Sequence, residues 1–150
     1  MKYFQGIEVG IPRELGGHTV TAAEITEFAA KYDPLPFHTD PEAATETIHG
    51  GLIASGYHSL CLANRILVDE FRTDIAAVAG FGVDDLTWHA PVRPGDELVV
   101  PSEITDKRPS KSRPGLGIVE NSVTVTRDDE VVLSYRTAGV VERQAGGNSG

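Results

Sequence analysis

The strongest constraint on the fold of this chain is one long stretch that is apolar or small around nearly a whole helical circumference. Residues 50–71, with the sequence GGLIASGYHSLCLANRILVDEF, contain no acidic residue before Asp69. We predict a helix that starts near Gly50 and Gly51 and is buried on all sides, as helices of this composition normally are. Because a chain of 150 residues suits one core, we expect a sheet to curl around this helix.

The second half of the chain supplies the strands of such a sheet. Its runs of β-branched residues are typical of strands, and short connections between them favour antiparallel pairing. Pro94 and Gly95 predict a tight turn, and residues 127–130 predict a hairpin. A further short strand is predicted at Tyr3 and Phe4. The main candidate strands are residues 78–83, 86–89, 97–105, 116–126 and 130–141, so the predicted fold class is α+β.

A proline-stiffened segment with an acid and a histidine precedes the long helix. Thr21 opens the pattern TAAE, which predicts the start of an amphipathic helix. That helix must end near Asp33, because Pro34 and Pro36 cannot continue it. Asp33 and His38 are therefore held on rigid chain, where a carboxylate and an imidazole could share one water for acid–base chemistry. An Asp and a His at this spacing can also form a simple capping or turn arrangement.

Charge and composition exclude several classes of protein. The formal net charge of -9 would repel a nucleic-acid backbone, and no basic helix compensates for it. The sequence has no apolar run of roughly 18 residues and does not begin with a basic segment followed by an apolar one. We therefore expect neither a membrane span nor secretion. Cys61 is the only cysteine, which suits a reducing cytoplasm, and its neighbours predict a small core residue.

Four blocks of the sequence together resemble the MaoC-like dehydratase family, whose members include the R-specific enoyl-CoA hydratases. The blocks are FAAKYDPLPFHTDPEAA, GGLIASGYHS, APVRPGDEL and RPSKSRPGLGIV, and they occur in the family's order. The resemblance runs over about residues 3–141. It implies the hotdog fold, an antiparallel sheet wrapped around one long helix and usually paired as a homodimer. Higher homo-oligomers are equally compatible with the sequence. We expect a single hotdog domain over residues 1–143, followed by a flexible tail over residues 144–150.

The resemblance also implies a site. Asp33 and His38 match the family's catalytic aspartate and histidine, and Ser55 matches a serine that lies near the pair. Gly50 and Gly51, at the expected helix start, could present backbone N–H groups to an enolate oxygen, although two glycines there could also be loop punctuation.

The implied activity is that of a hydro-lyase, which reversibly hydrates a 2-enoyl-CoA without a cofactor. His38 would take the proton from water and Asp33 would orient the water, although the two roles could be reversed. Leu35 stands where R-specific hydratases often carry asparagine, which leaves the acyl group open. One alternative is an acyl-CoA thioesterase, but hotdog thioesterases commonly place an acid on the central helix. The other is a non-catalytic acyl-binding subunit, which would need neither member of the pair.

One cluster of basic residues has two interpretations. The basic residues Lys107, Arg108, Lys111 and Arg113 crowd into DKRPSKSRPG, where they could bind the phosphates of coenzyme A or form a solvated turn.

His38, His49 and His58, with Asp33 or Asp40, form a superficial cluster of possible metal ligands. None of them shows the spacing of a known metal-binding motif, so we predict no metal site.

Overall fold

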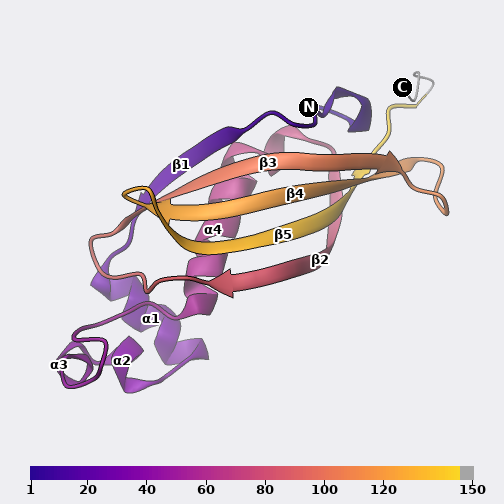
Figure 1. Cartoon of the computed structure of the whole chain (residues 1–150). Coiled ribbons are helices and arrows are strands. Elements are labelled where there is room, and N and C mark those ends of the chain that lie inside the picture. The colour runs from indigo at the N-terminus through magenta and orange to yellow at the C-terminus, as the bar shows by residue number, and fades with distance from the viewer. Residues whose placement is uncertain (146–150) are drawn as a thin grey trace.

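The computed structural model describes residues 1–145, which form one curved antiparallel sheet and a long helix in its hollow (Figure 1). The strand order is β1-β3-β4-β5-β2, so β1 and β2 are the two edges. Three shorter helices gather at one end of the long helix. The elements are β1 (Arg13–Thr19), α1 (Ala22–Tyr32), α2 (Pro36–Thr39), α3 (Pro41–Thr45), α4 (Gly56–Glu70), β2 (Ala77–Trp88), β3 (Glu97–Pro109), β4 (Leu116–Arg127) and β5 (Glu130–Glu142), with short 3-10 turns η1 (Phe4–Gly6) and η2 (Arg72–Asp74).

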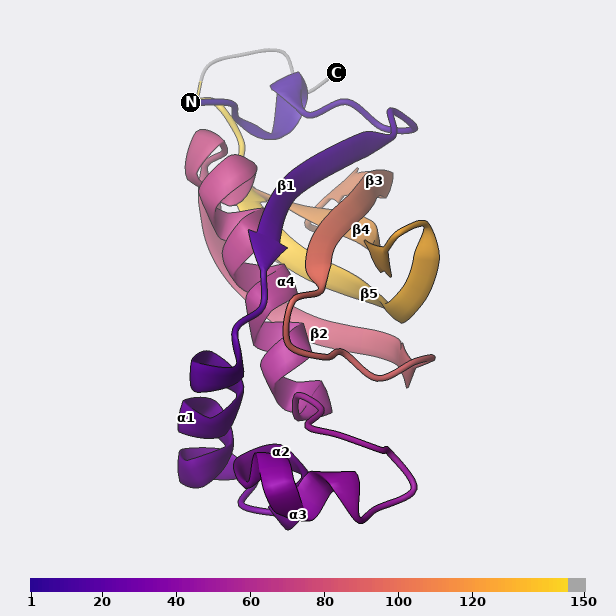
Figure 2. The ribbon, with the colours of Figure 1, turned by 90° about the vertical axis from the view of Figure 1, so that its left-hand side faces the viewer.

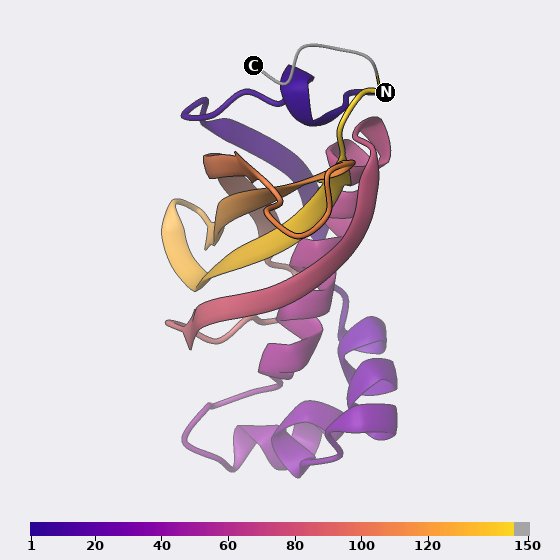
Figure 3. The ribbon, with the colours of Figure 1, turned by 90° about the vertical axis from the view of Figure 1, so that its right-hand side faces the viewer.

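The core lies between α4 and the concave face of the sheet (Figures 2 and 3). Every second residue along most of β4 is buried, because alternate side chains of a strand point to opposite faces. Val123 and Val125 on this strand meet the same core as Ala63 and Leu67 of α4. The predicted α+β class, with an antiparallel sheet around one long helix, is therefore confirmed.

The observed strands match the predicted ones from residue 97 onward and differ from them earlier in the chain. The runs predicted at residues 97–105, 116–126 and 130–141 correspond to β3, β4 and β5, whereas the two short runs before them are one continuous strand, β2. The predicted strand at Tyr3 and Phe4 was wrong, since Phe4 begins a 3-10 turn. The true first strand, β1, was missed because RELGGHT is largely polar and its register with β3 shifts between Leu15 and His18.

The start and the burial of the long helix also differ from the prediction. α4 begins at Gly56, because the chain just before it is held extended by two neighbouring segments. Ile53 N–H donates to the carbonyl of Phe37, and Ala54 N–H donates to the carbonyl of Val92.

One face of α4 is open within a single chain. Tyr57 is 60% exposed and Cys61 is exposed as well, so the predictions of a helix buried on all sides and of a core cysteine were wrong.

The predicted tail falls almost wholly outside the described residues. Of residues 144–150, the structure describes Gln144 and Ala145, and the N–H of Gln144 donates to the side-chain oxygen of Gln5. In the part of the chain that is described, no helix has both the length and the apolar character needed to cross a membrane.

Candidate active site

The chain turns sharply between α1 and α2, near the amino end of α4 (Figure 2). This turn brings the side chains of Asp33 and His38 together. α1 ends at Asp33, whose N–H donates to the carbonyl of Ala29 at 2.8 Å and closes the last turn. Pro36 then occupies the first turn of α2, where its missing N–H costs nothing. His38 follows on the same short helix. The rigid connection expected between Asp33 and His38 is therefore a helix end followed by a single helical turn.

The ring of His38 is buried, and one main-chain acceptor fixes its orientation. Its Nδ1 lies 2.8 Å from the carbonyl oxygen of Ile53. A carbonyl oxygen can only accept, so Nδ1 carries the proton, and in the neutral ring Nε2 presents a lone pair. Phe37 packs edge-on against the ring, with 4.4 Å between the ring centroids. His38 is thereby held as a proton acceptor at Nε2.

The carboxylate of Asp33 faces that lone pair. Its Oδ2 lies 3.5 Å from Nε2 of His38 and accepts a 2.7 Å hydrogen bond from the hydroxyl of Ser55. Ser55 is fully buried in the position before α4, and its hydroxyl is used on Asp33 instead of capping the helix. The structure therefore brings together three of the predicted site residues. A water beside the gap between Oδ2 and Nε2 could contact both atoms.

The pair opens into a cavity of about 400 Å³. Gly56 and Tyr57, the first residues of α4, line this cavity and carry N–H groups that have no acceptor within the helix. The helix dipole adds positive potential at the same place. Donors at a helix start beside an acid–base pair are suited to stabilise a developing negative charge.

Trp88, at the end of β2, forms the facing wall of the cavity. Its indole lies so close to α4 that a Cβ atom built on Gly56 would be 2.5 Å from it. Gly56, Tyr57 and Trp88 were missed by the sequence reasoning. The signal that could have found the first two is Ser55 directly before a glycine, because serine is favoured at the residue that precedes a helix.

The two glycines predicted as the oxyanion site lie before this cavity and do not line it. Gly50 has a φ of 67°, and its N–H donates to the carbonyl of Thr47 at 3.0 Å. The prediction that a helix starts at Gly50 and Gly51 was wrong, and the amide of Gly50 is already engaged in a turn. The N–H groups at the true helix start are those of Gly56 and Tyr57.

The four basic residues lie at the end of β3 and in the loop that leads to β4. That loop is at the opposite end of the sheet from the three short helices (Figure 1). Lys107 and Arg108 are near the end of β3, roughly 35 Å along the strand from its beginning at 3.3 Å per residue. The amine of Lys107 donates to main-chain carbonyls near the N-terminus, and Arg108 pairs with two carboxylates. Lys111 and Arg113 are exposed in the following turn. A single chain does not bring this cluster to its own Asp–His pair.

The histidines considered as metal ligands lie apart. Within residues 1–145, no group of three or more His, Cys, Asp or Glu side chains is placed to hold a metal ion. His49 lines the same cavity as His38, whereas the ring of His58 stacks on Phe28 of α1 with 4.6 Å between centroids. Burial lowers the pKa of His58, and Glu24 partly offsets this effect.

Known proteins resemble this chain in sequence. A family model described as the MaoC-like domain matches residues 8–127. A 3-hydroxybutyryl-CoA dehydratase from Methylorubrum extorquens is 29% identical over 132 residues, which cover 87% of this chain and 78% of that protein. Protein MaoC from Klebsiella aerogenes is 33% identical over 108 residues, 71% of this chain and 31% of that protein. The chain thus spans about a third of the length of this second relative.

Solved structures resemble it in shape. A MaoC-like dehydratase from Rhodospirillum rubrum matches with a TM-score of 0.85 and 38% identity, covering 95% of this chain and 97% of that one. An (R)-hydratase from A. caviae matches with a TM-score of 0.74 and 25% identity, covering 93% and 99%. A Mycobacterium tuberculosis protein described as a double hotdog matches at 0.83 and 17% identity, covering 99% and 46%, which bears on the fold alone. The predicted hotdog fold is confirmed.

Proposed function

Because this chain belongs to the MaoC-like domain family, we propose that it is a hydro-lyase that reversibly hydrates a 2-enoyl-CoA to an (R)-3-hydroxyacyl-CoA. The observation that carries the proposal is the Asp33 carboxylate 3.5 Å from the free Nε2 of His38, beside the amino end of α4. The relatives named as a 3-hydroxybutyryl-CoA dehydratase and an (R)-hydratase support this reaction class. We place the reaction in the cytoplasm, which suits the free thiol of Cys61.

In the proposed reaction, one water is shared by His38 and Asp33. Nε2 of His38 takes a proton from the water while the water oxygen bonds to the β-carbon of the enoyl group. Asp33 accepts a hydrogen bond from the second water proton and offsets the positive charge that forms on the imidazole. The proton on Nε2 then passes to the α-carbon on the same face. The O–H bond of the water and the π bond of the enoyl group are broken while one C–O and one C–H bond are made, so the ring ends neutral.

The intermediate of this addition is an enolate, whose negative charge develops on the thioester oxygen. We propose that the N–H groups of Gly56 and Tyr57 stabilise that charge, because they are donors fixed in place before the substrate arrives. The dipole of α4 acts in the same direction.

Two assays on the purified chain test the function. Crotonyl-CoA is supplied first and loss of its conjugated absorbance is followed, and the chirality of the product is determined. A saturated acyl-CoA is then supplied and release of free thiol is followed. Hydration to the R product without thiol release supports the proposal. Thiol release alone would make the chain a thioesterase, and the absence of both reactions would leave an acyl-binding subunit.

We also propose that two copies pair through β2. This edge strand is exposed along nearly its whole length, and its apolar side chains Val78, Phe81 and Val83 are 52%, 58% and 52% exposed. A long apolar edge of this kind is ordinarily covered in a stable protein. Light scattering coupled to size exclusion should therefore report twice the mass of the chain. A monomer at every concentration tested would contradict this assembly.

A further inference from the structure

The connection between β2 and β3, residues 89–96, forms one wall of the candidate active site. Its first residues line the cavity that contains the Asp–His pair, namely His89, Ala90, Pro91 and Val92. The β2–β3 connection, the β4–β5 hairpin and the three short helices lie at the same end of the sheet (Figure 1). Connecting segments are ordinarily more mobile than the strands they join, so a wall of this kind needs fixed contacts.

One carboxylate ties the β2–β3 connection to the β4–β5 hairpin. Oδ2 of Asp96 accepts from the main-chain N–H of Arg93 at 2.8 Å and from Nη1 of Arg127 at 2.7 Å. The same Nη1 donates to the carbonyl oxygen of Pro91 at 2.6 Å, and Nη2 of Arg127 donates to Glu130. The side chains of Arg127 and Asp96 are 16% and 19% exposed. This ion pair is therefore largely shielded from water, and its hydrogen bonds are of the strong, charged kind.

Two further contacts pass from the β2–β3 connection to the segment that precedes α4. The N–H of Ala54 donates to the carbonyl of Val92 at 2.8 Å, and Nη2 of Arg93 donates to the carbonyl of His49 at 2.6 Å. These contacts fasten residues 49–54 at both ends. The extended course of this segment therefore depends on where the β2–β3 connection lies.

The fastened segment and the residue after it carry the two groups that orient the Asp–His pair. The carbonyl of Ile53 accepts from Nδ1 of His38 at 2.8 Å, which leaves the lone pair on Nε2. The hydroxyl of Ser55 donates to Oδ2 of Asp33 at 2.7 Å. A shift of this segment would displace the acceptor of one side chain and the donor of the other at the same time.

We propose that Asp96 and Arg127 are positioning residues for the reaction, which act on His38 and Asp33 through the β2–β3 connection and residues 49–55. Within residues 1–145, the lining of the cavity includes neither Asp96 nor Arg127, so their effect passes through the backbone. The expected effect on turnover rests on the proposed function. The expected effect on the tautomer of His38 does not depend on that function.

NMR of the full chain, with histidine labelled at its ring nitrogens, tests the positioning without any substrate. At about pH 8, where an imidazole is neutral, we expect the wild type to show His38 protonated at Nδ1 alone. Asp96→Ala should add a population protonated at Nε2, because the carbonyl of Ile53 is no longer held in place. This variant should fold, since the main chain of Asp96 stays bonded to Val20 and Arg93. The signals of His38 are identified by their loss in His38→Asn.

Two more variants separate positioning from a general loss of stability. Arg127→Met removes the other half of the ion pair and should shift the tautomer in the same direction as Asp96→Ala. The double variant should add little, because both changes act through one contact. Val123→Ala is the matched control, since Val123 is fully buried on β4 and its truncation lowers Tm away from the β2–β3 connection. An unchanged tautomer of His38 in both Asp96→Ala and Arg127→Met would overturn the proposal.

Turnover of crotonyl-CoA connects the positioning to the reaction. We expect kcat of Asp96→Ala to fall by about tenfold to 100-fold while KM changes less than about twofold, because a small displacement of the catalytic groups slows the chemical step. Asp96→Asn keeps an acceptor oxygen for Arg93 and should lose less. A wild-type chain that hydrates no thioester, with a tautomer of His38 that depends on Asp96, would overturn the proposed function and leave the positioning. Wild-type kcat from Asp96→Ala would overturn the positioning and leave the function.

Discussion

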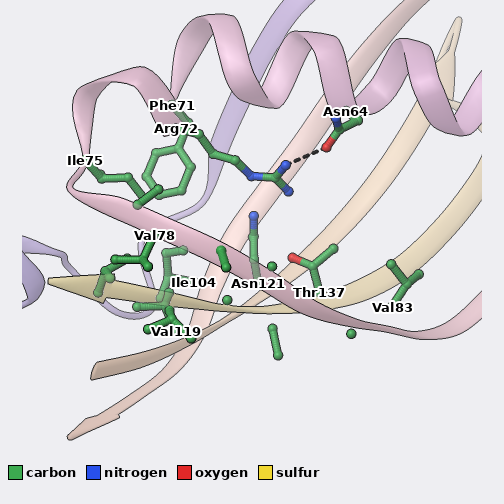
Figure 4. Close-up of a pocket in the computed structure, with 18 of the residues that line it drawn as sticks. Asn64, Phe71, Arg72, Ile75, Val78, Val83, Ile104, Val119, Asn121 and Thr137 are labelled. Atoms are coloured by element: carbon green, nitrogen blue, oxygen red, sulfur yellow. Dashed lines mark hydrogen bonds between the residues drawn. The ribbon is translucent and has the colours of Figure 1, made fainter. Parts of the chain in front are cut away.

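The two ends of α4 differ in how completely their polar atoms are paired. At the amino end, Ser55 donates to Asp33 and His38 donates to Ile53, so the orientation of both titratable side chains is set by the protein. At the carboxyl end, the guanidinium of Arg72 donates to the amide oxygen of Asn64 (Figure 4), and the buried hydroxyl of Tyr135 has no hydrogen-bond partner among residues 1–145. The orientation of the Asp–His pair is therefore fixed before any ligand arrives, whereas the carboxyl end leaves a buried hydroxyl unpaired within a single chain.

The largest effect on the hydration rate is expected when His38, the proposed base at the amino end of α4, is removed. His38→Ala should lower the hydration rate of crotonyl-CoA by roughly 10²–10⁴-fold, because a positioned general base contributes about that factor. Asp33→Asn should have an effect of the same order, since the amide can no longer offset the imidazolium charge. Steady-state kinetics with Asp69→Asn as the control, an exposed acid on α4, measures this. Wild-type rates from both variants would remove the pair from the mechanism.

A methyl group at the start of α4 should produce the next largest effect. Gly56→Ala would put Cβ 2.5 Å from the indole of Trp88, so the tryptophan or the helix must move. We expect a loss of about 1–3 kcal/mol in the free energy of unfolding and a fall in turnover of more than tenfold. Trp88 is the only tryptophan, so its fluorescence reports the displacement directly. Gly115→Ala, where Cβ meets nothing, is the matched control, and equal behaviour of the two variants would contradict the packing.

A smaller effect is expected when the carboxylate loses its buried donor. Ser55→Ala removes the 2.7 Å hydrogen bond to Asp33 and leaves the carboxylate in place. A hydrogen bond to a charged group is worth about 1.5–3 kcal/mol, so kcat should fall by about tenfold. KM should change little, because the bond orients the acid and does not touch the thioester. Ser112→Ala, in an exposed turn, serves as the control. A change in KM alone would argue that Ser55 contacts the substrate.

The smallest effect concerns His58, in the first turn of α4. Burial lowers the pKa of His58 below its ordinary value of 6.5, while Glu24 raises it and His18 lowers it further. Below 6.5 the unfolded chain therefore binds a proton more readily than the folded chain does, and the free energy of unfolding falls as the pH falls. Above 6.5 the contribution is constant. His58→Phe should flatten this dependence when Tm is measured against pH. His89→Gln is the control, and an unchanged slope in His58→Phe would contradict the assignment.

Local chain chemistry was enough to predict where Asp33 and His38 lie relative to α1. Pro34 and Pro36 cannot continue α1, so the sequence itself places Asp33 at the end of that helix. The three long strands were predictable for a similar reason, since their β-branched residues suit a pleated surface. The resemblance to a family then assigned roles that the spacing of Asp33 and His38 alone leaves open.

Features that depend on distant partners were not predictable. Residues 50–55 have a helical composition, but Phe37 and Val92 take up their backbone N–H groups and hold the segment extended. A cavity along α4 is lined by Arg72, Asn121 and Tyr135 from η2, β4 and β5, and no local pattern connects these three residues. β1 is a strand chiefly because its backbone pairs with that of β3.

Asp33 is both the residue that closes α1 and the residue whose carboxylate meets Ser55. One amino acid inserted anywhere within α1 would rotate everything after it by about 100° and advance it by about 1.5 Å. The acid would then swing away from the buried hydroxyl, even though no residue of the site had been replaced. The number of residues from Thr21 to Asp33 therefore fixes the position of the carboxylate. Insertions and deletions that preserve the proposed reaction should instead fall in the hairpin turns.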